Sequence, residues 1–157
     1  MGAIVLCILG SIVLDHVLGS GHGDDWSQFD GRQVMVISAD DAQTIRVRDD
    51  ASDQITQVRV LGIGSTDEPW GEKSREFLAA SLTGRMVTLK LEPTQTRDPR
   101  DRLLASVFLE DGRPISVDVV DRGLARADRR QPYAFRVEVE RAQSDARKKH
   151  RGVWTGY

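Results

Sequence analysis

The sequence predicts a mainly β, α+β domain: a five-stranded barrel of the OB-fold type with about three helices, preceded by a hydrophobic segment. Two observations predict it. Short runs that alternate apolar and polar residues recur between turn residues, and one helical pattern interrupts these runs while two follow them. The chain has 157 residues, which is enough for one domain with a hydrophobic core but hardly for two.

The strands are expected where apolar residues alternate with polar ones. In one such run, Ile45 and Val47 point to one side while Arg46 and Arg48 point to the other, as in a half-buried strand. We expect antiparallel pairing throughout and a partly open Greek-key barrel. The predicted strands are 33–38, 44–48, 57–61, 87–91 and 103–109.

Helices are predicted at 72–82, 117–122 and 134–149. In the first, Phe77, Leu78 and Leu82 form an apolar stripe and Gly84 ends the helix. The side chains that we expect to be mainly buried are Val58, Val60, Phe77, Leu78, Phe135 and Trp154.

The hydrophobic segment is an aliphatic run at residues 3–14. As a helix it would span roughly 18 Å, well short of the hydrocarbon core of a bilayer. That length is typical of a secretory signal, which would be cleaved after Gly19. However, a signal usually begins with Lys or Arg, and neither precedes this run. A tilted membrane anchor is the alternative. Both remain open: we expect a signal peptide or membrane anchor at 1–19, a linker at 20–32, the barrel domain at 33–157, and an exported or membrane-anchored protein.

The charge is balanced overall, with 22 Lys and Arg against 24 Asp and Glu, and does not by itself indicate nucleic-acid binding. Basic residues are in excess within 97–151, and most are Arg, whose fork matches phosphate oxygens. An ordinary solvated surface of mixed charge is the alternative. The chain has one Cys and three His that are separated in the sequence, so no group of Cys and His residues has the spacing of zinc ligands.

Several phrases, in order along the chain, resemble the staphylococcal-nuclease-like (thermonuclease-like) family. Each is weak alone, but together they cover most of the chain. They are VRVLGI at 58–63, GEKSREFL at 71–78, DRLLA at 101–105, VVDRGLA at 119–125 and the segment 142–154 that ends in RGVW.

This resemblance implies a calcium-dependent nuclease that cleaves DNA and RNA. In the family, carboxylates and a Thr carbonyl bind Ca²⁺, a Glu positions or deprotonates the attacking water, and two arginines clamp the phosphate. Arg59 and Arg102 match these two catalytic arginines, and Arg100 lies beside the second. The general-base position falls on Asp67, or on Glu68 with one inserted residue.

The calcium ligands of the family are not retained. Gln43 and Gly64 occupy two of the aspartate positions, whereas Thr44 keeps its backbone carbonyl and Asp41 lies nearby. Ca²⁺ takes six to eight oxygen ligands and depends on carboxylate charge, so the metal site is expected to be degenerate. Restoring both carboxylates by Gln43→Asp and Gly64→Asp is expected to raise calcium affinity, provided that Gly64 does not need a positive φ.

Two functions follow. The favoured one is a pseudoenzyme, a catalytically weak or inactive module that keeps Arg59 and Arg102, recruits Arg100, Arg129 and Arg130, and binds nucleic acid, another anionic ligand or a protein partner. The alternative is an active calcium-dependent endonuclease that hydrolyses phosphodiester bonds of DNA or RNA at an atypical metal site. Ca²⁺ is a cofactor only in the second case, and the N-terminal segment makes a membrane a further expected partner.

Overall fold

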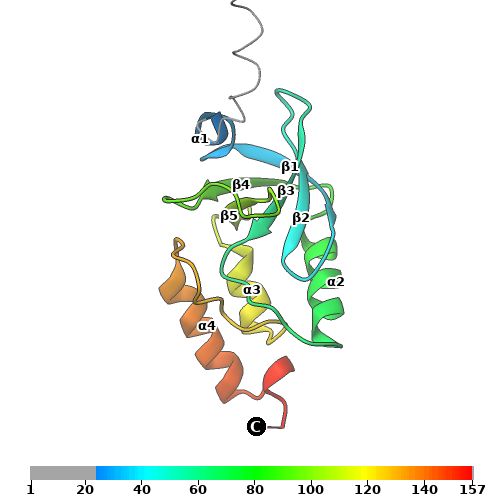
Figure 1. Ribbon diagram of the computed structural model, residues 1–157. Coiled ribbons are helices and arrows are strands. Elements are labelled where there is room, and N and C mark those ends of the chain that lie inside the picture. Colours follow the sequence, from blue (N-terminus) through cyan, green and yellow to red (C-terminus); the bar gives the residue numbers. More distant parts are fainter. Residues whose placement is uncertain (1–23, 157) are drawn as a thin grey trace, which may run out of the picture.

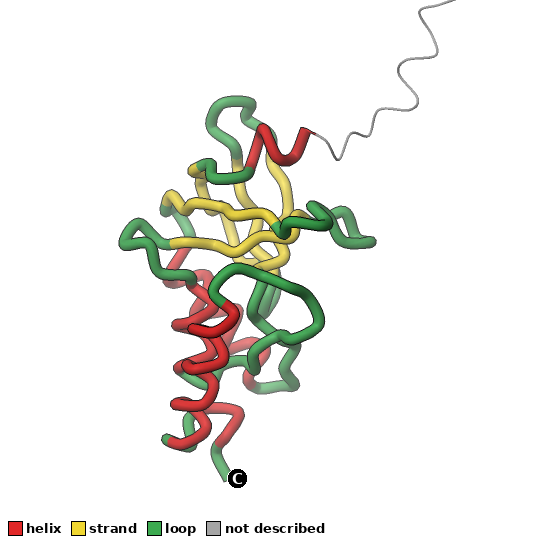
Figure 2. Tube along the Cα trace, turned by 90° about the vertical axis from the view of Figure 1, so that its left-hand side faces the viewer, coloured by secondary structure: helices red, strands yellow, loops and turns green. Residues whose placement is uncertain are grey.

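The structure is a computed structural model, and it describes residues 24–156. Figures 1 and 2 show a barrel with helices α2, α3 and α4 below it and the short helix α1 at its other end. The strands are β1 (Gln33–Ala39), β2 (Thr44–Arg48), β3 (Ile55–Val60), β4 (Met86–Leu91) and β5 (Leu103–Phe108). The helices are α1 (Asp24–Phe29), α2 (Trp70–Leu82), α3 (Ile115–Asp121) and α4 (Arg136–Lys148), followed by a 3₁₀ turn, η1 (Gly152–Trp154).

The five strands form a closed barrel in the order β1-β2-β3-β5-β4. All neighbours are antiparallel except β3 and β5, which run parallel from Val58 opposite Leu103 to Val60 opposite Ala105. The predicted barrel class is confirmed, but the partly open and fully antiparallel form is wrong. A closed ring with an odd number of strands cannot alternate direction all the way round, so closure requires one parallel pair.

Two apolar clusters hold this arrangement together. The first fills the barrel with the inward residues of the strands, among them Val34, Ile45 and Leu89, which are fully buried. The second lies between the outer face of the barrel and the helices, where Leu104 of β5 meets Val120 of α3 and Val139 of α4. Because β5 is covered on both faces, its residues are nearly all buried rather than alternating.

The predicted helices are present, with small shifts at their ends. Of the side chains expected in the core, Val58, Val60, Leu78 and Trp154 are buried. Phe77 is only partly buried, and the guanidinium of Arg122 lies 4.7 Å from the centre of its ring. The prediction for Phe135 is wrong: this residue precedes α4 with a left-handed φ of 65° and is 44% exposed, its ring packing edge-on against Phe108.

The structure also differs from the predicted linker at 20–32. Residues Asp24–Phe29 form α1, and Phe29 is fully buried in the barrel core. Trp26 and Phe29 are the two large apolar residues in this polar stretch, and two residues are too few to establish a helical period, which is why the sequence pattern missed this helix. The predicted signal or anchor at 1–19 lies outside the described residues. Within the described part of the chain, none of the helices has the length and apolar character needed to cross a bilayer.

Candidate functional site

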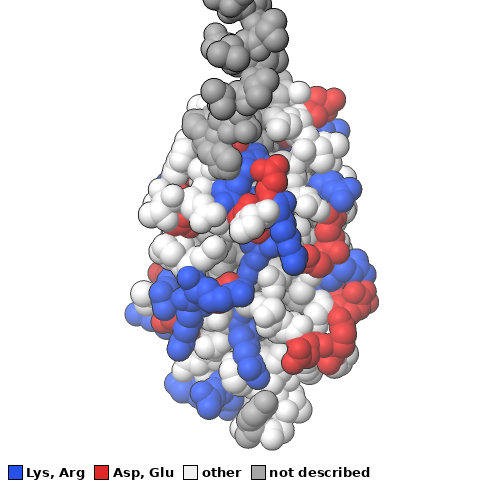
Figure 3. All heavy atoms as spheres, viewed as in Figure 1, with Lys and Arg blue, Asp and Glu red and all other residues white. Residues whose placement is uncertain are grey.

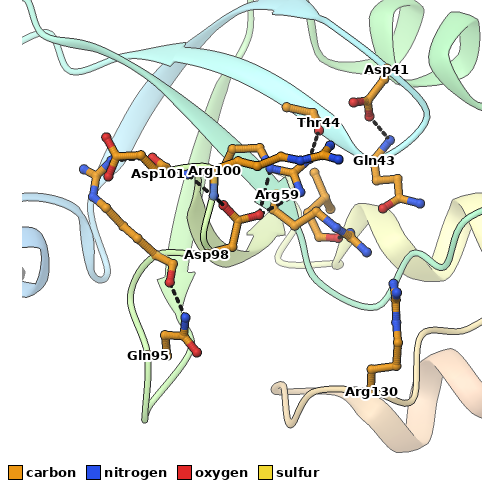
Figure 4. Close-up of polar contacts among 12 residues, drawn as sticks. Asp41, Gln43, Thr44, Arg59, Gln95, Asp98, Arg100, Asp101 and Arg130 are labelled. Atoms are coloured by element: carbon orange, nitrogen blue, oxygen red, sulfur yellow. Dashed lines mark hydrogen bonds and ion pairs between the residues drawn. The ribbon is translucent and has the colours of Figure 1, made fainter.

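A cleft of about 520 Å³ opens on the side of the barrel where β2, β3 and the loop before β5 meet. We call it the arginine cleft, because four arginines lie along it together with two aspartates (Figure 4). It brings together residues that the sequence singled out from distant segments. Its lining consists of Asp41, Ala42, Gln43, Arg59, Ser65, Thr66, Asp98, Pro99, Arg100, Arg102 and Arg130.

Arg59 lies in β3 opposite Thr44 of β2. The alternation of β3 turns it away from the barrel core, yet its side chain is only 7% exposed. Its guanidinium donates to the carbonyls of Val60 (2.6 Å) and Ile63 (2.8 Å) and to the carboxylate of Asp128 (3.0 Å). Burial lowers the pKa of Arg59 to about 10, so the group stays charged at neutral pH and is balanced by Asp128.

Arg102 is held just as firmly at the start of β5. Its Nε and Nη2 lie 2.8 and 2.7 Å from Oδ2 of Asp98, and its Nη1 donates to the hydroxyl of Thr44 at 2.8 Å. Asp98 also accepts the backbone N–H groups of Arg100 and Arg102, each at 3.0 Å. Burial raises the pKa of the Asp98 carboxyl, but the hydrogen bonds from Arg102 and the backbone outweigh it and hold this pKa below its usual range.

Asp128 forms ion pairs with two arginines of the cleft, Arg59 and Arg130. Besides Arg59, its carboxylate contacts Arg130 through Nε (3.0 Å) and Nη2 (2.9 Å). The Arg130 side chain is 70% exposed, so it still faces solvent across the cleft. Arg100 is exposed as well. The cleft thus has two arginines embedded in its wall, Arg59 and Arg102, and two at its rim, Arg100 and Arg130.

The two candidates for the general base lie elsewhere. Asp67 lines a separate, smaller hollow with Trp70 and Arg126, and Glu68 accepts the backbone N–H of Glu72 at 3.4 Å at the beginning of α2. Neither is among the residues that line the arginine cleft. Of the acidic residues that the sequence singled out, only Asp41 lies there.

The residues that the resemblance aligns with the family's calcium ligands do not fit a calcium ion. A side chain at position 64 would meet backbone: the Cβ would lie 2.8 Å from the carbonyl oxygen of Arg126, which already accepts the Gly64 N–H at 2.7 Å. The Thr44 carbonyl, expected as a ligand, accepts the N–H groups of Asp40 (2.8 Å) and Asp41 (3.3 Å). Within residues 24–156, no three acidic, His or Cys side chains are grouped as metal ligands would be.

Two functional partners, Asp98 and Asp128, were not predicted. Asp98 lies four residues before Arg102, a spacing that pairs side chains in helices but has no fixed meaning in a loop. Asp128 is 69 positions from Arg59, and no local pattern could have connected them.

Comparisons with known proteins agree with this architecture. The family model described as staphylococcal nuclease homologue matches residues 41–156, which include the arginine cleft. A thermonuclease of Staphylococcus hyicus is 29% identical over 130 residues, covering 76% of this chain and 74% of that protein. Because this family model spans most of its length and the fold is a closed five-stranded barrel, the chain belongs to the staphylococcal nuclease homologue family.

Proposed function

We propose that the arginine cleft binds phosphate groups of nucleic acid and that the domain cleaves them weakly or not at all. The convergence of Arg59, Arg100, Arg102 and Arg130 on one cleft carries this proposal. Four guanidinium groups face three carboxylates, those of Asp41 and Asp98 in the lining and that of Asp128 behind Arg59 and Arg130, which leaves a surplus of one positive charge. Guanidinium forks match the oxygens of phosphate and keep their charge at any physiological pH.

The surrounding surface supports a chain-like anion rather than a single small one. On the face shown in Figure 3, basic side chains predominate from the centre to the lower left, whereas acidic side chains lie at the upper centre and, interspersed with basic ones, near the right edge. A polyanion can therefore lie over the basic part of this face and avoid the acidic side chains. The net charge of −2 does not oppose this, because the potential near a cleft depends on nearby charges more than on the total.

The same contacts support the proposal that cleavage is weak or absent. Attack on a phosphodiester needs stabilisation of the growing charge on the phosphoryl oxygens and a base for the water. Arg59 is held by Asp128 and by the carbonyls of Val60 and Ile63, and the residues aligned with calcium ligands do not fit the ion. The alternative, an atypical nuclease, would need Asp67 or Glu68 to reach a phosphate held in a cleft that neither lines.

Binding is tested by fluorescence anisotropy with a fluorescein-labelled single-stranded DNA oligonucleotide at several salt concentrations. Arg100→Ala and Arg130→Ala should each weaken binding and reduce the slope of log affinity against log salt by about 1, as expected when one phosphate contact is lost. Arg85→Ala is the matched control, because Arg85 is exposed but does not line the cleft. Equal affinity and slope in all four proteins would contradict the proposal.

Cleavage is tested with the same oligonucleotide in CaCl₂ and in EGTA. We expect little calcium-dependent product from the unmodified chain. Robust cleavage that EGTA abolishes, and that Arg102→Ala abolishes too, would favour the atypical nuclease over the binding module.

A further inference from the structure

The loop 97–102, which carries both Arg100 and Arg102, is held from outside the barrel by α1. The carboxylate of Asp25 accepts Nε of Arg97 at 2.9 Å and Nη2 at 2.8 Å, a two-point ion pair. It also accepts the hydroxyl of Thr96 at 2.9 Å. The side chains of Asp25 and Arg97 are only 7% and 13% exposed, so this contact is shielded from water and salt.

Arg97 connects α1 to the part of the loop that lines the arginine cleft. Its Nη1 donates to the carbonyl of Asp101 at 2.8 Å, and its backbone forms a bridge with Leu103. The next residue, Asp98, grips Arg102 through the hydrogen bonds described above. A continuous series of polar contacts therefore runs from α1 through Arg97 and the loop to the guanidinium of Arg102.

We infer that Asp25 and Arg97 are positioning residues for phosphate binding, which makes α1 part of the binding unit. This inference rests on the proposed function of the arginine cleft. Two single side-chain bonds also tie the loop to the barrel, from Arg102 to the Thr44 hydroxyl (2.8 Å) and from Arg97 to the Thr56 hydroxyl (3.4 Å). Its backbone bonds include short-range ones, such as Asp98 N–H to the Arg102 carbonyl (3.0 Å) and Asp101 N–H to the Asp98 carbonyl (2.9 Å). The two-point ion pair with Asp25 is therefore the strongest anchor outside the loop. A loop without its outer anchor must be ordered when the ligand binds, and that ordering lowers affinity.

The sign of the effect separates positioning from simple electrostatics. Asp25 is negative, so replacing it with a neutral residue should tighten the binding of an anion if only long-range charge matters. Positioning predicts the opposite, weaker binding.

The experiment uses the full chain and the fluorescein-labelled oligonucleotide. Asp25→Asn should bind about tenfold more weakly, the effect of ordering one or two arginine side chains anew. Asp30→Asn is the matched control: it removes the same charge just beyond α1, but Asp30 accepts the Leu91 N–H at 2.9 Å on β4 and does not touch the loop. We expect Asp30→Asn to bind as tightly as the unmodified chain or slightly more tightly, and Asp25→Glu to recover part of the loss.

Hydrogen–deuterium exchange gives a readout that does not depend on any ligand. In Asp25→Asn, the amides of Asp98, Asp101 and Arg102 should exchange faster, while those of β1 and β2 keep their protection, measured at a temperature where circular dichroism shows the variants folded. Unchanged affinity in Asp25→Asn, or unchanged exchange at these amides, would overturn the inference. An unmodified chain that does not bind the oligonucleotide would refute the proposed function instead, and in that case the exchange data still decide whether α1 orders the loop.

Discussion

The close approach of two backbone segments at Gly64 makes a sharp prediction. An added Cβ would lie 2.8 Å from the Arg126 carbonyl oxygen, tighter than real Cβ contacts allow without movement of a neighbour. That oxygen belongs to backbone tied in place by the pairing of Ile63 with Ala127 and by the Asp128 N–H donating to the Gly62 carbonyl at 3.0 Å. We therefore expect Gly64→Ala to destabilise the fold by about 1–3 kcal/mol, the usual cost of overpacking.

The measurement is urea unfolding followed by circular dichroism, with a thermal scan alongside. For a chain of this length the loss corresponds to a fall in Tm of about 2–12 °C. Gly71→Ala is the matched control, because its Cβ would mainly meet the flexible carboxylate of Glu68, at 3.1 Å, and because Ala favours the helix in which Gly71 lies. If Gly64→Ala were as stable as the unmodified chain, the assignment of this contact as a steric barrier would be refuted.

The same barrier bears on the restoration of a calcium site. Gly64 is not among the glycines with positive φ, so the strain expected from its backbone conformation does not arise, and the Arg126 carbonyl is the obstacle instead. We expect Gln43→Asp to fold normally and the double variant with Gly64→Asp to lose stability without the gain in calcium affinity that the sequence alone predicts. Calorimetric titration with CaCl₂ checks this, and clear calcium binding by a stable double variant would show that the 126–128 segment yields.

Four further predictions concern stability and location. Phe77→Ala should cost less than the about 3–5 kcal/mol typical of a fully buried Phe, because its ring is only partly covered, and urea unfolding measures the difference. Asp128→Ala should cost about 3–5 kcal/mol, because it leaves the charge of Arg59 buried without its partner; a loss below about 1 kcal/mol in the same assay would mean that water or Arg59 itself relaxes the site. Since the pKa of Asp98 is lower in the folded state than its ordinary value of 3.8, the stability that it contributes is present above that pH and is lost as the pH falls through the folded-state pKa; Asp98→Asn should flatten this acid-side loss in unfolding curves recorded from pH 7 downwards. Cell fractionation with N-terminal sequencing should find either a mature chain that begins at Ser20 or an intact chain in the membrane fraction, and an intact soluble chain would contradict both explanations of the apolar run at 3–14.

Local pattern predicted most of the scaffold. The strand Thr44–Arg48 was predicted with its bounds, and α2 was predicted to within two residues, because alternation and a helical stripe are properties of neighbouring residues. The same holds for the placement of Arg59 in a strand and of Arg102 directly before one. Five strands can close into a barrel only with a parallel pair, so the parallel pair follows from the strand count once closure is known. Closure itself could not be predicted, because no single segment of the sequence indicates it.

The charge state of the cleft depended on contacts between residues far apart in the chain. Alternation turned Arg59 outward, and only the tertiary structure shows it covered by the segment that carries Asp128, 69 positions away. The ion pair between Asp25 and Arg97 spans 72 positions and joins a stretch predicted as linker to the loop before β5. Residue types and spacing determined that this chain folds into a five-stranded barrel, and they singled out Arg59 and Arg102, which the structure brings to one cleft. Only the tertiary structure shows which carboxylates pair with those arginines and which backbone carbonyl excludes a side chain at Gly64. These contacts arise from the packing of loops, and such packing produces no periodic pattern in the sequence.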